Sequence, residues 1–160
     1  MKILPSKLFP GCELNTDKDS GFYDIIPQGF EHEVSLFISC ETAKSDAAIA
    51  KAAAFFDKLH EWNTLCKNAF LAAEEGSEDG DMIAEYFEFY KEEAPEVFGD
   101  ADPDDLFLPD MLELLALGNM ASHGAGEEQI FNVDFTLGFD QLLCAYFNSD
   151  FDLDHIAWES

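Results

Sequence analysis

The sequence contains no arginine, and its eight basic residues are lysines, set against 34 aspartates and glutamates and a formal net charge of -26. Arginine supplies the planar guanidinium that holds a phosphate or carboxylate through two parallel hydrogen bonds, so its absence disfavours phosphoryl-transfer chemistry. The excess of negative charge also opposes contact with nucleic acid and with anionic membrane lipid. We therefore expect a basic protein partner or no macromolecular partner.

Paired cysteines and long apolar runs are also missing. Cys12, Cys40, Cys66 and Cys144 are dispersed and form no Cys-x-x-Cys motif. The amino terminus lacks the apolar run of a secretory signal, and no stretch of 18 apolar residues is available to span a membrane. These features predict a cytoplasmic protein with reduced thiols, in which Cys66 and Cys144 act as small core residues.

Apolar and aromatic residues are abundant. They make up 48% of the chain and include sixteen phenylalanines, which is too much burial potential for an acidic disordered chain. A length of 160 residues suits one domain with a core of useful size. We expect a single domain over residues 1–160, with strands and turns in 1–40, helices in 45–117 and antiparallel strands in 129–160.

The strands are predicted from alternation of apolar and polar residues. At the carboxy-terminal end, Phe131, Val133 and Phe135 alternate with polar residues, and a second alternating run covers residues 142–147. At the amino-terminal end the best strands are 21–26 and 30–39, with Phe37 as an apolar exception on the solvent face of the second. Antiparallel strands from both ends of the chain are expected to build one sheet.

The middle of the chain changes to a helical period. Ser45 or Thr42 can cap a helix that begins near Asp46 and runs as one piece to the acids before Gly76. A second helix follows residues 77–81 and ends before Pro95. The residues around Pro103 are typical of a third helix start, and the segment 111–117 is predicted to be helical with Gly118 as its end.

The pattern leaves the state of residues 114–121 open between helix and strand. The predicted fold class is α+β, with an antiparallel sheet covered on one face by two or three helices.

Several segments resemble a known bacterial family. They are Phe-Phe-Asp-Lys-Leu at 55–59, Ile-Ala-Glu-Tyr-Phe-Glu-Phe-Tyr at 83–90, Val-Asp-Phe-Thr-Leu-Gly at 133–138, Leu-Leu-Cys-Ala-Tyr-Phe at 142–147 and the final Ile-Ala-Trp-Glu-Ser. Their order resembles the DUF2004 family, a domain of unknown function. The resemblance implies a small cytoplasmic α+β protein, with some relatives that are immunity-protein candidates beside toxin genes. It implies no catalytic residues.

Motifs for metal binding or catalysis are weak. Alternating acids at 150–154 are similar to the start of an EF-hand loop, but His155 stands where that loop needs glycine. The four histidines, His32, His60, His123 and His155, are isolated, and no Gly-x-Ser-x-Gly motif occurs. We predict no catalytic residue, no metal site and no cofactor. A hydrolase with Cys40 or Cys144 brought to a distant histidine by the fold stays an alternative.

The strongest functional signal is the acidic segment from Glu74 to Asp110. It predicts a non-enzymatic binding protein, for example an immunity or inhibitor protein for a basic partner such as a nuclease toxin. A second alternative is a structural or oligomeric protein whose acidity serves solubility and whose dimer buries Phe37 or Phe89. The predicted partner-binding residues are Glu74, Glu75, Asp81, Glu85, Glu88, Glu92, Asp104 and Asp105.

Overall fold

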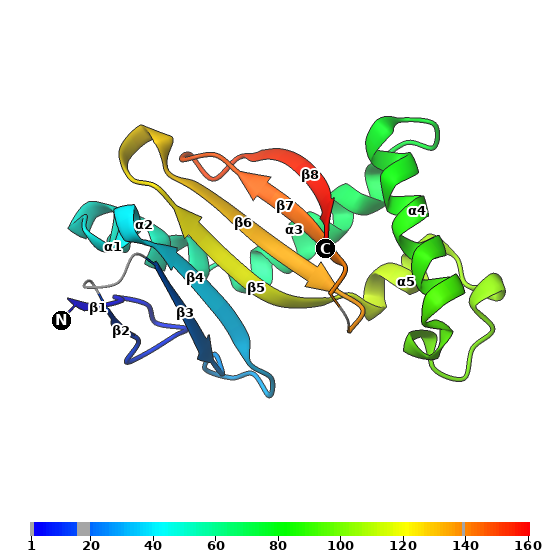
Figure 1. Cartoon of the computed structure of the whole chain (residues 1–160), viewed down its shortest axis with the longest axis horizontal. Coiled ribbons are helices and arrows are strands. Elements are labelled where there is room, and N and C mark those ends of the chain that lie inside the picture. Colours follow the sequence, from blue (N-terminus) through cyan, green and yellow to red (C-terminus); the bar gives the residue numbers. More distant parts are fainter. Residues whose placement is uncertain (1, 16–19, 139) are drawn as a thin grey trace.

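A six-stranded sheet forms the centre of the computed structural model, which describes residues 2–15, 20–138 and 140–160 (Figure 1). The strand order follows the chain, β3-β4-β5-β6-β7-β8, and a separate pair, β1 and β2, lies beside it. The strands are β1 Lys2–Ile3, β2 Glu13–Leu14, β3 Ser20–Ile25, β4 Val34–Ser39, β5 Ala116–His123, β6 Ile130–Thr136, β7 Leu142–Phe147 and β8 Leu153–Glu159.

Neighbouring strands are antiparallel except β4 and β5, which pair in parallel. The helices lie in the chain between these two strands, and a crossover of this kind lets the second strand return in the same direction. The sheet therefore joins amino- and carboxy-terminal strands, which confirms the predicted α+β class. It is mostly, not wholly, antiparallel.

Five helices and three short 3-10 helices lie among the described residues. They are α1 Cys40–Ala43, α2 Asp46–Phe56, α3 Leu59–Ala72, α4 Glu78–Glu93, η1 Pro95–Phe98, η2 Pro103–Asp105, α5 Leu108–Leu114 and η3 Gly126–Glu128. No helix in the described part of the chain is long and apolar enough to cross a membrane.

The prediction of one continuous helix from Asp46 to the acids before Gly76 was wrong, because α2 ends at Phe56 and α3 begins at Leu59. No proline or glycine marks this break in the sequence. The intervening Asp57 instead holds the amino-terminal segment through its carboxylate, which accepts hydrogen bonds from the Ser6 hydroxyl (2.6 Å) and the Leu8 amide (3.0 Å).

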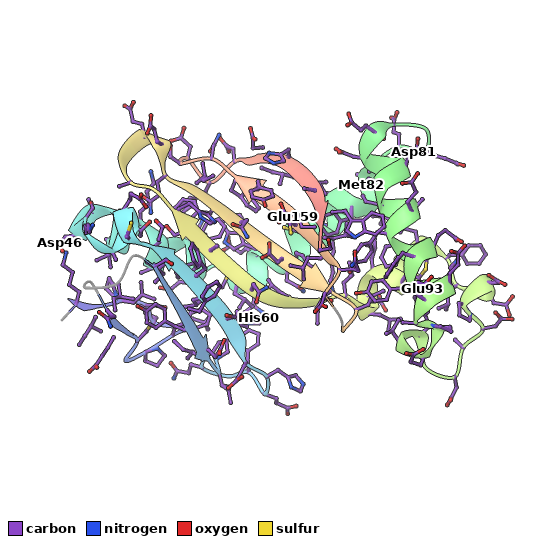
Figure 2. The ribbon with its side chains drawn as sticks, in the orientation of Figure 1. Asp46, His60, Asp81, Met82, Glu93 and Glu159 are labelled. Atoms are coloured by element: carbon purple, nitrogen blue, oxygen red, sulfur yellow. The ribbon has the colours of Figure 1, made fainter. Side chains whose placement is uncertain are left out.

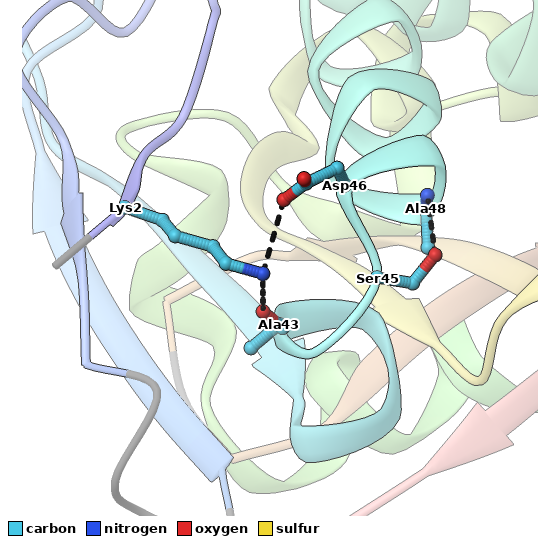
Figure 3. A network of polar contacts seen from close by, with 5 residues as sticks. All are labelled: Lys2, Ala43, Ser45, Asp46 and Ala48. Atoms are coloured by element: carbon cyan, nitrogen blue, oxygen red, sulfur yellow. Dashed lines mark hydrogen bonds and ion pairs between the residues drawn. The ribbon is translucent and has the colours of Figure 1, made fainter.

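The start of α2 is fixed by local polar contacts (Figure 3). The Ser45 hydroxyl oxygen accepts a hydrogen bond from the Ala48 amide (3.2 Å), which confirms Ser45 as a cap. The Lys2 ammonium lies 3.0 Å from the Asp46 carboxylate and donates to the Ala43 carbonyl (3.4 Å). The first strand is thereby tied to the helical layer.

Helix α5 ends at Leu114 and β5 begins at Ala116, so the predicted helical region 45–117 extends too far, and the segment 114–121 that the pattern left open is mostly strand. Gly118 does not end a helix, because it lies within β5 at a register shift between Leu117 and Asn119. Strand β5 hydrogen bonds to β4 on one side and β6 on the other, so pairing on two sides decides the state of this segment.

The helix predicted to begin after Asp102 is also shorter than expected. Its side chain accepts a hydrogen bond from the Asp104 amide (3.0 Å), but the turn that follows is the 3-10 helix η2.

The core lies between the sheet and the helices α2 and α3, which cover one face of the sheet (Figure 1). Phe55 is fully buried at its centre. Its ring stacks on Phe131 of β6 (centroids 4.5 Å apart) and on Trp62 of α3 (4.8 Å), and it meets Phe147 edge-on. These aromatic contacts fix both helices on the sheet, while the opposite face faces the viewer in Figure 1.

Helix α4 lies beside the end of the sheet, next to β8 (Figure 1). The hydroxyls of Tyr86 and Tyr90 both donate to the Gln141 carbonyl, at 2.9 and 3.1 Å. Tyr86 and Phe89 also pack against Trp158 of β8. Phe89, considered above for a dimer surface, is thus half-buried against the sheet. The buried face of α4 anchors it and leaves the other face to solvent.

Candidate functional site

The acidic lobe, defined as residues 74–114, consists of the turn before α4, α4 itself, the connection through η1 and η2, and α5. Every acid in it is exposed, and Lys91 is its sole basic residue. Figure 2 labels two of these acids, Asp81 and Glu93, on α4. These sixteen acids are Glu74, Glu75, Glu78, Asp79, Asp81, Glu85, Glu88, Glu92, Glu93, Glu96, Asp100, Asp102, Asp104, Asp105, Asp110 and Glu113. They are almost half of the 34 acids of the chain.

The eight predicted partner-binding residues fall into three groups. Asp81, Glu85, Glu88 and Glu92 recur at steps of four, three and four residues, so α4 presents them as one stripe. Glu74 and Glu75 lie in the turn that leads into α4. Asp104 and Asp105 lie in η2, in the connection from α4 to α5.

The turn that leads into α4 is held by specific contacts. The Ser77 hydroxyl caps the helix by accepting from the Gly80 amide (3.0 Å), and the Asp81 carboxylate accepts from the Gly76 amide (3.1 Å). Gly76 has a φ of +88°, a left-handed conformation that favours glycine. A Cβ at Gly80 would lie 2.0 Å from the Glu74 carbonyl oxygen, so only glycine fits there. The acids of this turn therefore have defined positions.

A groove of about 350 Å³ lies where the lobe meets α3, between α3, α4 and α5. Its floor is apolar and includes the buried side chains of Phe70, Ile83, Phe87 and Met111. Its lining also includes three exposed acids and, among the described residues, no lysine. These acids are Glu75, Asp81 and Glu88. The structure thus brings together three of the eight predicted residues around one apolar cavity.

Lysines in and beside the lobe neutralise little of its charge. The Lys91 ammonium lies 3.3 Å from the Glu88 carboxylate, one turn away on α4. Lys67 of α3 lies near Glu113 of α5; burial lowers the pKa of this lysine, and the glutamate offsets part of that effect. The lobe therefore presents mostly carboxylates that have no lysine within it to pair with.

A second polar cluster lies on the sheet face opposite α2 and α3. The His123 ring Nε2 hydrogen bonds to the Asn132 side-chain oxygen (2.9 Å), and the Asn132 amide donates to Asp134 (2.8 Å). Burial raises the pKa of Asp134, although its hydrogen bonds, first that from Asn132, oppose the shift. Further along, the hydroxyl of Tyr146 donates to the Glu159 carboxylate. The cluster connects β5, β6, β7 and β8.

The buried thiol of Cys144 belongs to this cluster and donates to Glu159 (3.6 Å). Burial, followed by the nearby charge of Asp134, raises its pKa strongly, so the thiol stays protonated at neutral pH. Nucleophilic cysteines have lowered pKa values and cationic neighbours. Cys144 therefore has the environment of a packed strand residue, as the sequence predicted.

The remaining sequence candidates are dispersed. His60 stacks on Phe30 (4.7 Å), His155 stacks on Tyr146 (4.6 Å), and His32 is exposed. The acidic stretch after Asn148 is a turn, in which the Asn148 side chain accepts from the amides of Asp150 and Asp152. In the described residues, no group of three or more His, Cys, Asp or Glu side chains is arranged to hold a metal ion.

No protein-family model matches this chain, and neither a curated protein nor a solved structure gives a significant match. The resemblance to a bacterial family of unknown function therefore stays a prediction.

Two features of the site went unpredicted. The groove was missed because Phe70, Ile83 and Met111 come from three helices, and their periodic spacing indicates only core positions. The cluster around Asp134 was missed as a unit because its residues lie on four strands. The polar positions of the alternating strand 130–136 are its one local signal.

Proposed function

We propose that this protein is a non-enzymatic binding module that takes a basic protein partner on its acidic lobe. One observation carries the proposal: sixteen exposed acids and one lysine are concentrated in residues 74–114, at one end of the molecule. A dense array of carboxylates attracts lysine- and arginine-rich surfaces and speeds their encounter. A nuclease toxin or another nucleic-acid-binding protein has such a surface, so an immunity or inhibitor role fits this chemistry.

The anchoring of the lobe supports binding over mere solubility. Tyr86 and Tyr90 fix α4 to the sheet, and Ser77 and Gly80 fix the turn before it. A surface that is ordered before binding loses less conformational entropy when a partner docks. Acidity that served solubility alone would be spread over the surface, whereas these acids are concentrated.

The environment of Cys144 gives no support to the hydrolase alternative, because its raised pKa disfavours the thiolate. The partner proposed here is bound in the cytoplasm, where a chain with reduced cysteines would be stable. Neither nucleic acid nor an anionic membrane suits a surface of this charge.

The test compares which proteins of the source cell's lysate are retained by the immobilised wild type and by two charge variants. The lobe variant carries Glu74→Gln, Glu75→Gln, Glu85→Gln and Glu92→Gln. The remote variant carries Glu31→Gln, Glu33→Gln, Glu127→Gln and Glu128→Gln, which neutralise four exposed acids outside the lobe. Both variants have the same net charge, so a difference between them reports location and not total charge.

We expect wild type and the remote variant to retain the same basic protein at about 50 mM salt and to release it at about 500 mM, because salt screens exposed charges. The lobe variant is expected to retain much less of it. Equal retention by the two variants, or a partner that salt does not release, would contradict the proposal.

A further inference from the structure

The groove in the acidic lobe combines an apolar floor with an acidic rim. Phe70 and Phe87 are almost completely buried beneath a cavity of about 350 Å³. That volume is within the range of pockets that bind small ligands or single large side chains. The apolar lining residues that stay accessible are Ala73, Ala84 and Leu108. An occupant that covers this accessible apolar lining removes it from water, which is favourable.

The rim determines what can fill it. Glu75, Asp81 and Glu88 line the same cavity, and none of its lining residues is a lysine. Lys91 lies outside the lining and pairs with Glu88. An acidic occupant would be repelled by these carboxylates, and a neutral occupant would leave their charge without a partner. A cationic occupant complements them.

We infer that the groove is a specificity pocket that receives one large apolar side chain flanked by lysine or arginine residues of the partner protein. The apolar side chain packs on the accessible lining residues Ala73, Ala84 and Leu108. The flanking cations reach the carboxylates of the rim. The inference rests on the proposed function, and it adds the sequence character of the segment that the acidic lobe would select.

A second copy of this chain does not meet that description. Each copy carries the same net charge of -26, so two lobes repel each other. The lysine-containing apolar segment at the amino terminus is not available either, because Leu4 and Phe9 are buried in the core. A basic segment of another protein is the occupant that the charges favour.

The pocket is tested with fluorescein-labelled synthetic peptides and fluorescence anisotropy. The probe is Lys-Lys-Ser-Trp-Ser-Lys-Lys. One control peptide replaces tryptophan by serine, and the other replaces all lysines by glutamine. The first control removes the apolar side chain and the second removes the charge, so their contributions are separated.

Two protein variants locate the effect. Ala84→Phe places a bulky ring in the groove from an exposed position of α4, and Ala84→Leu does so to a smaller extent. Ala54→Phe makes the same change at an exposed position of α2 and serves as the matched control. Circular dichroism verifies that each variant is folded.

We expect the tryptophan peptide to bind wild type at least about tenfold more tightly than the serine peptide, since burial of a large apolar side chain gives such a gain. Ala84→Phe should abolish this difference, Ala84→Leu should reduce it, and Ala54→Phe should preserve it. Equal affinity for the tryptophan and serine peptides would overturn the pocket, and so would a difference that survives in Ala84→Phe.

The charge control separates the two proposals. If the serine peptide binds and the four-residue lobe variant weakens it, while tryptophan adds nothing, the pocket fails and the proposed function stands. If the lysine peptides bind no better than the glutamine peptide, both fail.

Discussion

Replacement of Phe55 by leucine tests whether α2 and α3 are packed on the sheet as described, and therefore whether the lobe has a rigid base. Phe55 is fully buried and its ring stacks on Phe131 and Trp62, with centroids 4.5 and 4.8 Å apart. An aromatic pair contributes about 0.5–1.5 kcal/mol beyond its buried area. Loss of these two stacks predicts a destabilisation of about 1–3 kcal/mol in Phe55→Leu.

The leucine variant is preferable to alanine, because Phe→Ala in a core costs about 3–5 kcal/mol. Such a loss approaches the whole stability of a domain, which is about 5–15 kcal/mol. The matched control is Phe107→Leu, just before α5, where the side chain is 76% exposed and makes no ring contact among the described residues. Its effect should be within about 0.5 kcal/mol.

Both variants are measured by equilibrium urea unfolding, followed by tryptophan fluorescence and by far-ultraviolet circular dichroism. We expect a lower midpoint for Phe55→Leu with an unchanged slope, which signals lost stability without a change in the surface exposed on unfolding. Equal midpoints for Phe55→Leu and Phe107→Leu would contradict the packing of Phe55 against Phe131 and Trp62.

Two further predictions concern the acid cluster of the sheet and the turn before α4. Burial raises the folded-state pKa of Asp134, so its contribution to stability is full below its unfolded pKa of about 3.9 and is lost as pH rises through the folded pKa. In urea titrations, the free energy of unfolding of Asp134→Asn should therefore rise relative to that of wild type from acid to neutral pH. A difference between the two proteins that does not change with pH would contradict the raised pKa. Gly80→Ala should displace the Glu74 carbonyl and lower stability by about 1–2 kcal/mol, the loss of its hydrogen bonds outweighing the helix propensity of alanine. Thermal unfolding measures this loss of stability, with Gly118→Ala as the control, because a Cβ added there meets no atom within 4 Å. A Gly80→Ala variant more stable than wild type would disprove the close contact.

Local pattern predicted the features that depend on neighbours in the sequence. The alternation of Phe131, Val133 and Phe135 with polar residues gave β6 its buried face, and Ser45 marked the start of α2. The acids of the lobe were visible because most of them are close together in the chain.

Features that depend on distant partners could not be read from pattern. Nothing local separates α2 from α3, since the role of Asp57 is to hold residues 6–8. The segment that contains Gly118 becomes a strand because β4 and β6 both pair with it. The parallel β4–β5 pair follows from the helical crossover, and the groove exists only where three helices meet.

Docking of a basic partner on residues 74–114 is tested by a nuclear magnetic resonance titration. The nitrogen-15-labelled protein is titrated with the basic protein that it retains from lysate, and the backbone amide shifts are mapped. We expect the largest shifts in the turn before α4, along the stripe of Asp81, Glu85, Glu88 and Glu92, and in η2. Shifts confined to the opposite sheet face around Tyr146 and His155, with the lobe unchanged, would contradict this docking.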